Sequence, residues 1–328
     1  MHLLATQSAT LDEIDAAVDL GQTAGDVVVL SFSDSDLSAL AAAWRAAKQT
    51  LPSLRLASLK RLRHPMSVDL YVDDVVSKSR LVIVRSLGGL DYWRYGFEQV
   101  AEACRRSGSK LVALPGDDRP DPRLSALSTV SPQHASLFDA YFREGGAGNI
   151  GNALRLASAL ARGETFEAPV PVPLGPAILM SADGSAIDVA QWASTQASLG
   201  GALVVFYRSS LLADDFAPVR ALMLQLAAEG LDAAAVALTS LKDPAAAAMI
   251  DTLVAARRPS VIINTTAFSA RRSDDTTVLD AADCPVLQVA LAGTSNAAWA
   301  ASDRGLAPSD LAMHVVLPEL DGRLFTRA

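Results

Sequence analysis

The sequence predicts an α/β protein made of two doubly wound, mainly parallel-sheet domains in tandem. Short apolar runs rich in β-branched residues alternate with amphipathic segments of helical length. This alternation is typical of parallel strands that are buried under helices on both faces. It occurs twice along the 328 residues, and a proline-rich segment separates the two series. Each series therefore predicts a domain of the Rossmann-like or flavodoxin-like kind.

The first predicted domain spans residues 1–166 and ends in helices. Continuous apolar runs predict its strands, at Leu3–Thr6, Val27–Phe32, Arg55–Leu59, Leu81–Arg85 and Lys110–Leu114. Apolar residues at helical spacing predict its helices, at Asp36–Thr50, Met66–Ser77, Tyr92–Ser107, His134–Glu144 and Asn149–Arg162. The polar segment Ser33–Asp36 supplies the side chains expected to cap the first long helix.

Residues 167–176 form the predicted linker. Four prolines in the eight positions from Pro169 to Pro176 cannot sustain a helix or a central strand, so an extended, stiff connector is expected. The second domain then covers residues 177–328 and repeats the pattern. Its predicted strands are Ala177–Met180, Gly201–Arg208, Ala233–Thr239, Ser260–Thr266 and Pro285–Leu291. Its predicted helices are Phe216–Glu229, Pro244–Ala256, Asn296–Ser302 and Pro308–His314.

Composition excludes several classes of protein. Half the residues are apolar and a fifth are charged, which excludes a disordered chain. The 28 basic and 36 acidic residues give a net charge of −8, so nucleic acid is not an expected partner. Two cysteines 180 residues apart make neither a disulfide framework nor a zinc site, which indicates a cytoplasmic protein. No apolar run approaches the ~20 residues of a membrane span.

One literal motif fails on its context. Residues 146–151 match G-x-G-x-x-G, but a predicted helix precedes them where dinucleotide binding needs a strand. We interpret the segment as a turn between helices, with Asn149 or Asn152 capping the second helix. The chain contains no G-x-x-x-x-G-K-[ST] sequence, so it is not expected to hydrolyse ATP through a P-loop.

The remaining candidates are the loops after the strands, where open α/β sheets bind ligands. Residues 85–96 combine the adjacent glycines Gly88 and Gly89 with three aromatic residues and two arginines. In the second domain, polar groups follow the strands at residues 207–210, 240–243 and 264–269. Each loop has two open readings, because ligand sites concentrate at such positions but many such loops bind nothing.

Eight strings in order resemble the large-subunit family of aerobic cobaltochelatase (CobN) and the related magnesium chelatase large subunits. They run from about residue 85 to the last residue. The strings lie at residues 85–96, 145–154, 206–209, 240–243, 262–269, 285–295, 304–313 and 315–323.

The resemblance implies a function. Members of this family bind a tetrapyrrole and hold the metal-insertion site, and cobaltochelatase inserts cobalt(II) into hydrogenobyrinic acid a,c-diamide during aerobic cobalamin (vitamin B12) biosynthesis. ATP and Mg²⁺ are used by two partner subunits, an AAA+ ATPase and its companion, and not by this chain. Because family members are several times longer, the chain is expected to be an N-terminal portion, truncated in its second domain and inactive alone.

Candidate site residues follow from this chemistry. Metal insertion needs a base for two pyrrole protons and oxygen or nitrogen ligands for the metal. Glu319 is the expected base and a metal ligand, with Asp321 as a second ligand and His314 as a catalytic helper. Alternatively, Glu319 or Asp321 caps the next element or pairs with Arg323. Arginines suit a substrate rich in carboxylates, and aromatic rings suit a macrocycle. The expected substrate-binding residues are Arg85, Trp93, Arg94, Tyr95, Tyr207, Arg208, Asn264, Thr265, Thr266 and Arg323.

Two other functions remain open. The two domains could form a non-catalytic head that binds the tetrapyrrole or docks partner subunits, or the chain could belong to a magnesium chelatase-type homologue that uses a porphyrin. Titrating the chain with the corrinoid substrate separates the first alternative, because a pure docking head would show no binding.

Overall fold

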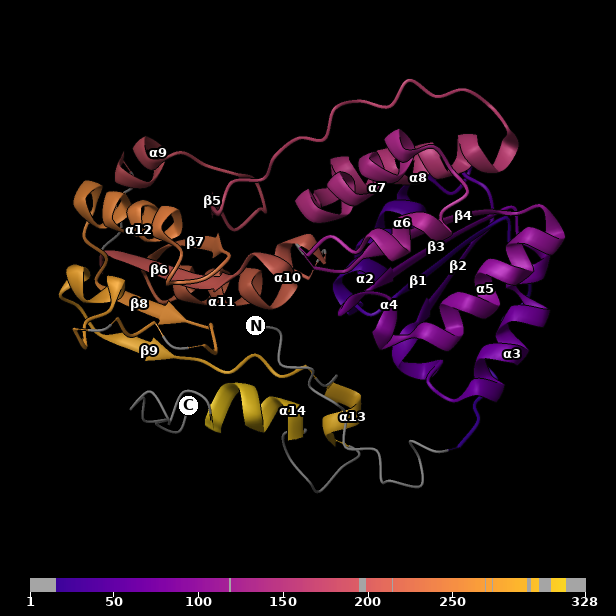
Figure 1. Cartoon of the computed structure of the whole chain (residues 1–328). Helices are drawn as coiled ribbons and strands as arrows, with labels where there is room; N and C mark the ends of the chain where they lie inside the picture. The colour runs from indigo at the N-terminus through magenta and orange to yellow at the C-terminus, as the bar shows by residue number, and fades with distance from the viewer. Residues whose placement is uncertain are drawn as a thin grey trace. The chain divides into compact units, whose positions relative to one another are not determined.

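The computed structural model describes residues 16–117, 119–194, 199–213, 215–268, 270–272, 274–293, 296–300 and 308–316. The described chain divides into two compact units (Figure 1). The N-terminal unit comprises residues 16–173 together with residues 212–213, and the C-terminal unit comprises residues 174–211 together with the residues from 215 onward. Each unit is an α/β structure with one mainly parallel sheet, which confirms the predicted fold class. The predicted strand Leu3–Thr6 lies outside the described residues.

The N-terminal sheet has four parallel strands in the order β2-β1-β3-β4. All residues of β1 and β3 are buried, as the apolar runs Val27–Leu30 and Leu81–Val84 predict for central strands. In register, Val29 of β1 pairs with Leu56 on one side and with Ile83 on the other. The chain reverses its winding direction between β1 and β3, so the sheet is doubly wound. The strands are β1 (Val27–Ser31), β2 (Leu54–Ser58), β3 (Leu81–Ser86) and β4 (Lys110–Pro115).

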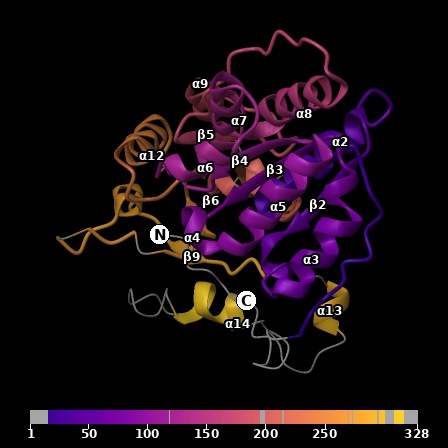
Figure 2. The ribbon, with the colours of Figure 1, turned by 45° about the vertical axis from the view of Figure 1, so that its right-hand side comes forward.

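Helices cover both faces of this sheet, as Figures 1 and 2 show. Alternate side chains of the central strands enter two separate cores. Val28 and Val82 pack beneath one set of helices, while Val29 and Ile83 pack beneath the other. The first set is α3 (Pro65–Asp74), α5 (Arg94–Ser107) and α6 (Pro122–Leu127); the second is α2 (Asp34–Ala47), α7 (Pro132–Glu144) and α8 (Gly146–Arg162).

The helix predicted at Tyr92–Ser107 begins two residues later, at Arg94, and a separate short helix precedes it. Gly88 adopts the left-handed conformation with φ 79°, and the short helix α4 (Gly89–Tyr92) follows it. The backbone leaves helical geometry at Trp93, and α5 begins at the next residue. Ser33 caps α2 by accepting a hydrogen bond from the Asp36 amide, in agreement with the expected capping segment.

The predicted capping role of Asn149 and Asn152 is wrong. Helix α8 begins at Gly146, and its N-cap is Gly145, whose φ of 65° suits glycine. Asn149 lies inside the helix, where its side chain donates back to the Gly145 carbonyl oxygen. Asn152 instead accepts a hydrogen bond from Arg155. A glycine cap ends α7 and starts α8, so no asparagine is needed at the turn.

The C-terminal sheet has five strands in the order β5-β7-β6-β8-β9. Strand β5 is an antiparallel edge, and the other four strands are parallel. Without β5, the order of the parallel strands repeats that of the N-terminal sheet, and the winding reverses between β6 and β8. The strands are β5 (Ala177–Met180), β6 (Gly201–Tyr207), β7 (Asp232–Leu238), β8 (Val261–Asn264) and β9 (Val286–Gln288).

Helices also cover both faces of the C-terminal sheet. One core holds Trp192 and Ile250 from α9 (Val189–Ser194) and α12 (Pro244–Ala256). The opposite core holds Val219 and Met223 from α11 (Ala217–Ala228). The short elements of the described part are η1 (Leu59–Arg61), η2 (Val76–Lys78), α10 (Arg208–Leu212), η3 (Val278–Ala282), α13 (Asn296–Ala300), α14 (Pro308–Leu311) and η4 (Ala312–Val316). Among the helices of the described residues, none has the length and apolarity that crossing a bilayer requires.

Candidate functional site

The winding of the N-terminal sheet reverses between β1 and β3, and we call the carboxyl ends of these two strands its switch point. A buried ion pair lies there. Arg85, at the end of β3, donates from Nη1 to Asp36 Oδ2 of α2 over 2.7 Å. The Ser31 hydroxyl, at the end of β1, donates to the same carboxylate oxygen, also over 2.7 Å. Parallel strands bring these carboxyl ends to one edge of the sheet, and the N-terminal turn of α2 places Asp36 between them. Charge compensation and hydrogen bonding together make this burial tolerable.

Arg85 has little surface to offer a substrate. It is 9% exposed, and its guanidinium carbon lies 5.7 Å from the centre of the Phe142 ring of α7. Its Nε atom is buried and has no hydrogen-bond partner among the described residues. The structure therefore places Arg85 in the wall of the switch point. Its guanidinium, which was expected to bind a substrate carboxylate, binds the Asp36 carboxylate instead.

The glycine loop after β3 already holds a carboxylate from the chain itself. The Leu90 amide donates to Asp121 Oδ2 over 3.0 Å. A Cβ atom on Gly89 would lie 2.5 Å from that oxygen, so only glycine fits there. Arg123 grips both oxygens of Asp121, through Nε at 2.9 Å and Nη2 at 2.8 Å. These bonds, chiefly the one from Arg123, hold the pKa of Asp121 well below its usual range.

Trp93 is part of the core. It is 7% exposed, and its indole Nε1 donates to the Leu62 carbonyl oxygen over 2.7 Å. A side chain on Gly96 would collide with the indole, since a Cβ atom there would lie 2.0 Å from it. Trp93 is therefore buried in this structure, and its contact with a macrocycle stays a prediction. The ring packs inward because the glycine leaves room for it.

Two predicted residues of the N-terminal unit face solvent. Arg94 is half-exposed and pairs with Asp91, which also accepts from Arg123. Tyr95 is 40% exposed, and its hydroxyl donates to Asp69 Oδ1 over 2.6 Å. That hydrogen bond to a carboxylate raises the pKa of Tyr95. These two side chains lie on the surface where α5 begins.

The C-terminal unit closes its switch point with neutral groups. Asn264, at the end of β8, is buried and donates from Nδ2 to Gln288 Oε1 of β9 over 2.9 Å. Gln288 Nε2 donates in turn to the Thr266 carbonyl oxygen over 2.8 Å. The hydroxyl of Thr266 donates to Asn264 Oδ1, and that of Thr265 donates to the Val205 carbonyl oxygen. Hydrogen bonds between amides and hydroxyls thus connect the strand ends of this unit, whereas an ion pair connects those of the other unit.

Tyr207, at the end of β6, holds the loop after β8. Its hydroxyl oxygen accepts from the backbone amides of Ala267 and Phe268, over 3.0 and 2.8 Å. Its ring contacts the Phe268 ring with centroids 6.2 Å apart. Strands β6 and β8 are neighbours in the sheet, so this bond joins the two sides of the switch point.

Arg208 binds the backbone that precedes β5. Its Nη1 donates to the carbonyl oxygens of Leu174 and Gly175, over 2.6 and 3.2 Å. After β7, Asp243 caps α12 and accepts a hydrogen bond from Thr239. Bonds to the Asp243 carboxylate, foremost from the Ala246 amide, lower its pKa. The loop at residues 240–243 therefore has a capping role in the fold.

The predicted catalytic and metal-binding residues escape structural description. Glu319, Asp321 and Arg323 lie outside the described residues, as does the side chain of His314. Within the described ranges, no group of three or more His, Cys, Asp or Glu residues is placed to hold a metal ion. In the described residues before them, Asp310 Oδ1 accepts a hydrogen bond from the Gly293 amide over 3.0 Å.

Sequence reasoning missed four residues of these two networks: Ser31, Asp36, Asp121 and Gln288. Asp36 was interpreted only as part of the capping segment Ser33–Asp36, and Asp121 was not singled out. Asp121 does cap α6, since it accepts from the Arg123 amide, but it also reaches across to Leu90. A sequence signal exists only for the capping, because the partners come from other strands.

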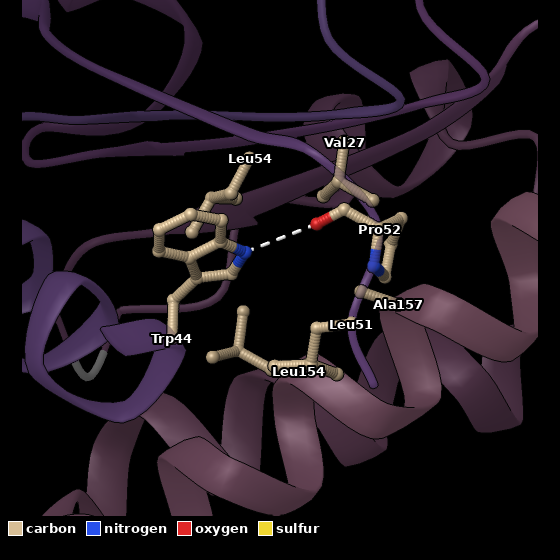
Figure 3. Close-up of a pocket in the computed structure, with 7 residues that line it drawn as sticks. All are labelled: Val27, Trp44, Leu51, Pro52, Leu54, Leu154 and Ala157. Carbon is tan, nitrogen blue, oxygen red and sulfur yellow. Dashed lines mark hydrogen bonds between the residues drawn. The ribbon is translucent and has the colours of Figure 1, made fainter. Parts of the chain in front are cut away.

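Each unit contains a cavity lined mainly by apolar residues. One, of about 10 Å³, is lined by apolar residues at the amino ends of β1 and β2, where Trp44 donates to the Pro52 carbonyl oxygen (Figure 3). It has room for about one water molecule. The other, of about 310 Å³, is an apolar hollow beside β5 and Met249. The first cavity is far too small for a tetrapyrrole.

Comparison with known proteins gives concordant matches. The model of a family described as CobN/Magnesium Chelatase matches residues 139–328. Two relatives, both aerobic cobaltochelatase subunits CobN, are 40% identical (Sinorhizobium sp) and 37% identical (Pseudomonas aeruginosa), over all of this chain and 26% of each relative. The solved catalytic subunit of cobaltochelatase from Mycobacterium tuberculosis is 25% identical, with a TM-score of 0.64, over 92% of this chain and 24% of that one. The chain thus spans about a quarter of the length of the proteins it matches.

Proposed function

The chain belongs to the CobN/magnesium chelatase family, and on that premise we propose that it works as part of the large subunit of an aerobic cobaltochelatase. The reaction is ATP-dependent insertion of cobalt(II), a substrate, into hydrogenobyrinic acid a,c-diamide in cobalamin biosynthesis. The observation that supports this proposal most strongly is the identity of 40% and 37% to two CobN subunits across the whole chain. The match to a solved cobaltochelatase catalytic subunit agrees with it.

The chemistry divides among the residues as follows. Removing two pyrrole protons needs a base, and the incoming cobalt(II) needs oxygen ligands until the macrocycle takes it. Glu319 serves as base and ligand, Asp321 as a second ligand and His314 as a helper. ATP and Mg²⁺ are handled by an AAA+ ATPase subunit and its companion. This division of labour agrees with the lack of a P-loop sequence in this chain.

In the N-terminal unit, exposed side chains bind the substrate. Arg94 can exchange its exposed pairing with Asp91 for a substrate carboxylate, because exposed ion pairs contribute little stability. Tyr95 adds an exposed ring beside it. Arg85, Asn264, Thr265 and Thr266 are buried, so they act by holding the strand ends in place.

A second function, a docking head without catalysis, is supported by a different observation. The predicted binding groups at both switch points already hydrogen-bond within the fold, as the Arg85–Asp36 pair and the Asn264–Gln288 pair show. Closed strand ends suit a rigid surface that positions other parts of a larger assembly. The experiment must therefore separate catalysis from binding.

The test uses the whole large subunit that contains this sequence, assembled with its ATPase partners. Glu319→Gln is expected to lower the rate of cobalt insertion by about a hundredfold, the usual contribution of a general base. Arg94→Met is expected to raise KM with little change in kcat, whereas Arg106→Met on the same helix serves as the matched control. An unchanged insertion rate in Glu319→Gln would remove that residue from the mechanism.

Binding is measured separately by titrating this chain with hydrogenobyrinic acid a,c-diamide. Saturable binding that Arg94→Met weakens supports a substrate-contacting role. No detectable binding, with normal insertion by the Arg94→Met subunit, supports the docking head. Insertion of Mg²⁺ into a porphyrin in place of cobalt insertion would assign the chain to a magnesium chelatase.

A further inference from the structure

Two arginines of the N-terminal unit hold one exposed carboxylate between them. Asp91 lies in α4, and each of its two carboxylate oxygens is bound by a different guanidinium. Arg94, the first residue of α5, donates to Oδ1, and Arg123 of α6 donates from Nη1 to Oδ2 over 2.8 Å. The three side chains are about half-exposed, at 53% for Arg94, 59% for Asp91 and 50% for Arg123. The two guanidinium groups therefore already have the spacing that one carboxylate at the surface requires.

A second carboxylate, which is mostly buried, holds Arg123 in place. Asp121, whose side chain is 11% exposed, accepts from Arg123 Nε over 2.9 Å and from Nη2 over 2.8 Å. Two parallel hydrogen bonds of this kind fix the plane of a guanidinium group. Nη1 takes no part in this pairing and binds Asp91 instead. Arg123 is thus fixed by one carboxylate while it presents its third nitrogen to another.

The glycine turn after β3 makes this arrangement possible. Asp121 Oδ2 also accepts from the Leu90 amide over 3.0 Å, which joins α6 to the neighbouring α4 (Figure 1). The same oxygen lies 2.5 Å from the place that a Cβ atom of Gly89 would take, and Gly89 has a φ of 69°. Only glycine combines that backbone conformation with such a close approach. The turn therefore positions Arg123 through Asp121.

The two carboxylates differ in how easily another carboxylate can replace them. Asp121 is mostly buried and is bound by Arg123 and by a backbone amide, whereas Asp91 is exposed. Exposed ion pairs contribute little stability, so a solute can compete for them. Hydrogen bonds, chiefly the one from Arg123, lower the pKa of Asp91, which is therefore ionised at neutral pH. When Asp91 turns away, two positive groups face one remaining carboxylate, and the excess positive charge suits an incoming carboxylate.

We propose that Arg94 and Arg123 form a binding site for a carboxylate group of the substrate, and that Asp91 occupies this site until the substrate replaces it. The inference rests on the proposed function, in which hydrogenobyrinic acid a,c-diamide supplies the carboxylate. Asp121 and Gly89 act as positioning residues, because they hold Arg123 and do not contact the substrate. The site distinguishes a carboxylate from an amide, since a neutral amide in place of Asp91 leaves the positive charge uncompensated.

The first test asks whether the site binds carboxylates, independently of metal insertion. Tricarballylate, a tricarboxylate without a macrocycle, is titrated into this chain, and the NMR signal of Arg123 Nε–Hε reports binding. Asp91→Asn is expected to lower the Kd about fivefold, because it removes the competing carboxylate. Arg94→Met is expected to raise the Kd about tenfold, because it removes a charged donor.

The control for this titration changes the net charge by the same amount. Asp74→Asn removes an exposed carboxylate that pairs with Lys78 on a different helix, and it should leave the Kd unchanged. A Kd that is the same in Asp91→Asn and in the wild type, or an equal decrease in Asp74→Asn, would overturn the proposal.

The second test uses the whole large subunit, assembled with its ATPase partners, and two corrinoids. One is hydrogenobyrinic acid a,c-diamide, and the other is the same macrocycle with its free carboxylates converted to amides. The wild type is expected to bind the acid more tightly than the amide, and this preference should fall about tenfold in Arg123→Met. Arg106→Met, at the other end of α5, should keep the preference. If Arg123→Met fails to fold, Asp91→Asn decides, because it alters only an exposed side chain and should strengthen binding of the acid alone.

The two tests separate this site from the proposed function. Cobalt insertion by the wild type, together with an acid preference that neither Arg123→Met nor Asp91→Asn changes, overturns the site and leaves the proposed function intact. Tricarballylate binding in the expected order, together with no cobalt insertion by the wild-type assembly, supports the carboxylate site and contradicts the proposed function.

Discussion

The two units share one arrangement of parallel strands but close their switch points with opposite chemistry. In the N-terminal unit, an ion pair between Arg85 and Asp36 fills the space between β1 and β3. In the C-terminal unit, Asn264 and its neutral partners fill the space between β6 and β8. The same topology is thus compatible with a charged or a neutral closure. Breaking the ion pair should therefore lower the stability of the protein more than breaking the neutral hydrogen bonds, because an unpaired buried charge costs far more free energy than an unpaired amide.

The candidate binding surface lies outside the two switch points. In an open α/β sheet the crevice at the switch point is the usual ligand site. Here the side chains that line it in each unit are bonded to one another, so the exposed residues beyond it, Arg94 and Tyr95, become the contacts to test. The predictions below ask whether the two closures differ as their chemistry implies.

The largest effect is expected from Arg85→Met. This change leaves the Asp36 carboxylate buried without its partner, and breaking a buried pair in this way costs about 3–5 kcal/mol. Urea unfolding measures the loss. Arg80→Met, which removes the exposed pair with Asp26, is the control and should cost less than about 1 kcal/mol. Equal losses in the two variants would show that the Arg85–Asp36 closure contributes no more than a surface pair.

A smaller loss is expected from Tyr207→Phe in the C-terminal unit. The ring and its packing remain, but the amides of Ala267 and Phe268 lose their common acceptor. Leaving such neutral donors unsatisfied costs about 1–3 kcal/mol, again measured by urea unfolding. Tyr95→Phe, at an exposed hydroxyl, is the matched control. If Tyr207→Phe lowers the free energy of unfolding as much as Arg85→Met does, the charged and the neutral groups at the two switch points do not differ in their contribution to stability.

The smallest effect concerns one cysteine in each unit. Burial raises the pKa of the Cys104 thiol to about 12 from an ordinary 9.0, so the folded state favours the protonated form. The stability that the protonated Cys104 thiol contributes to the folded state is fully present below pH 9 and is lost as the pH rises toward 12. Between pH 8 and pH 10 the wild type should therefore lose about 1 kcal/mol more stability than Cys104→Ala.

Cys284 provides the comparison for that experiment. Burial also raises the pKa of its thiol, but this residue is only partly buried. Cys284→Ala should therefore change the pH dependence of urea unfolding less than Cys104→Ala does. The reverse order would mean that the thiol environments of the two units are not those of the described structure.

Much of the fold was predictable from local pattern. The strands Val27–Ser31 and Leu81–Ser86 each begin with four consecutive apolar residues, and such runs occur in central parallel strands. Helix α12 was predicted with its observed bounds because Asp243 and Pro244 mark its start. The break at Trp93 was not predictable, since the indole leaves the helical path to reach Leu62 and the space above Gly96.

The sequence alone determined the fold class, the order of the elements and the family, because hydrophobic periodicity, caps and ordered strings are local properties. Only the tertiary structure decided what each polar side chain at the strand ends does. Arg85, Tyr207 and Arg208 were all expected at a substrate, yet each binds a group brought near by the chain from a distant position. A buried polar group must find a partner, and its identity depends on which segments the sheet places side by side.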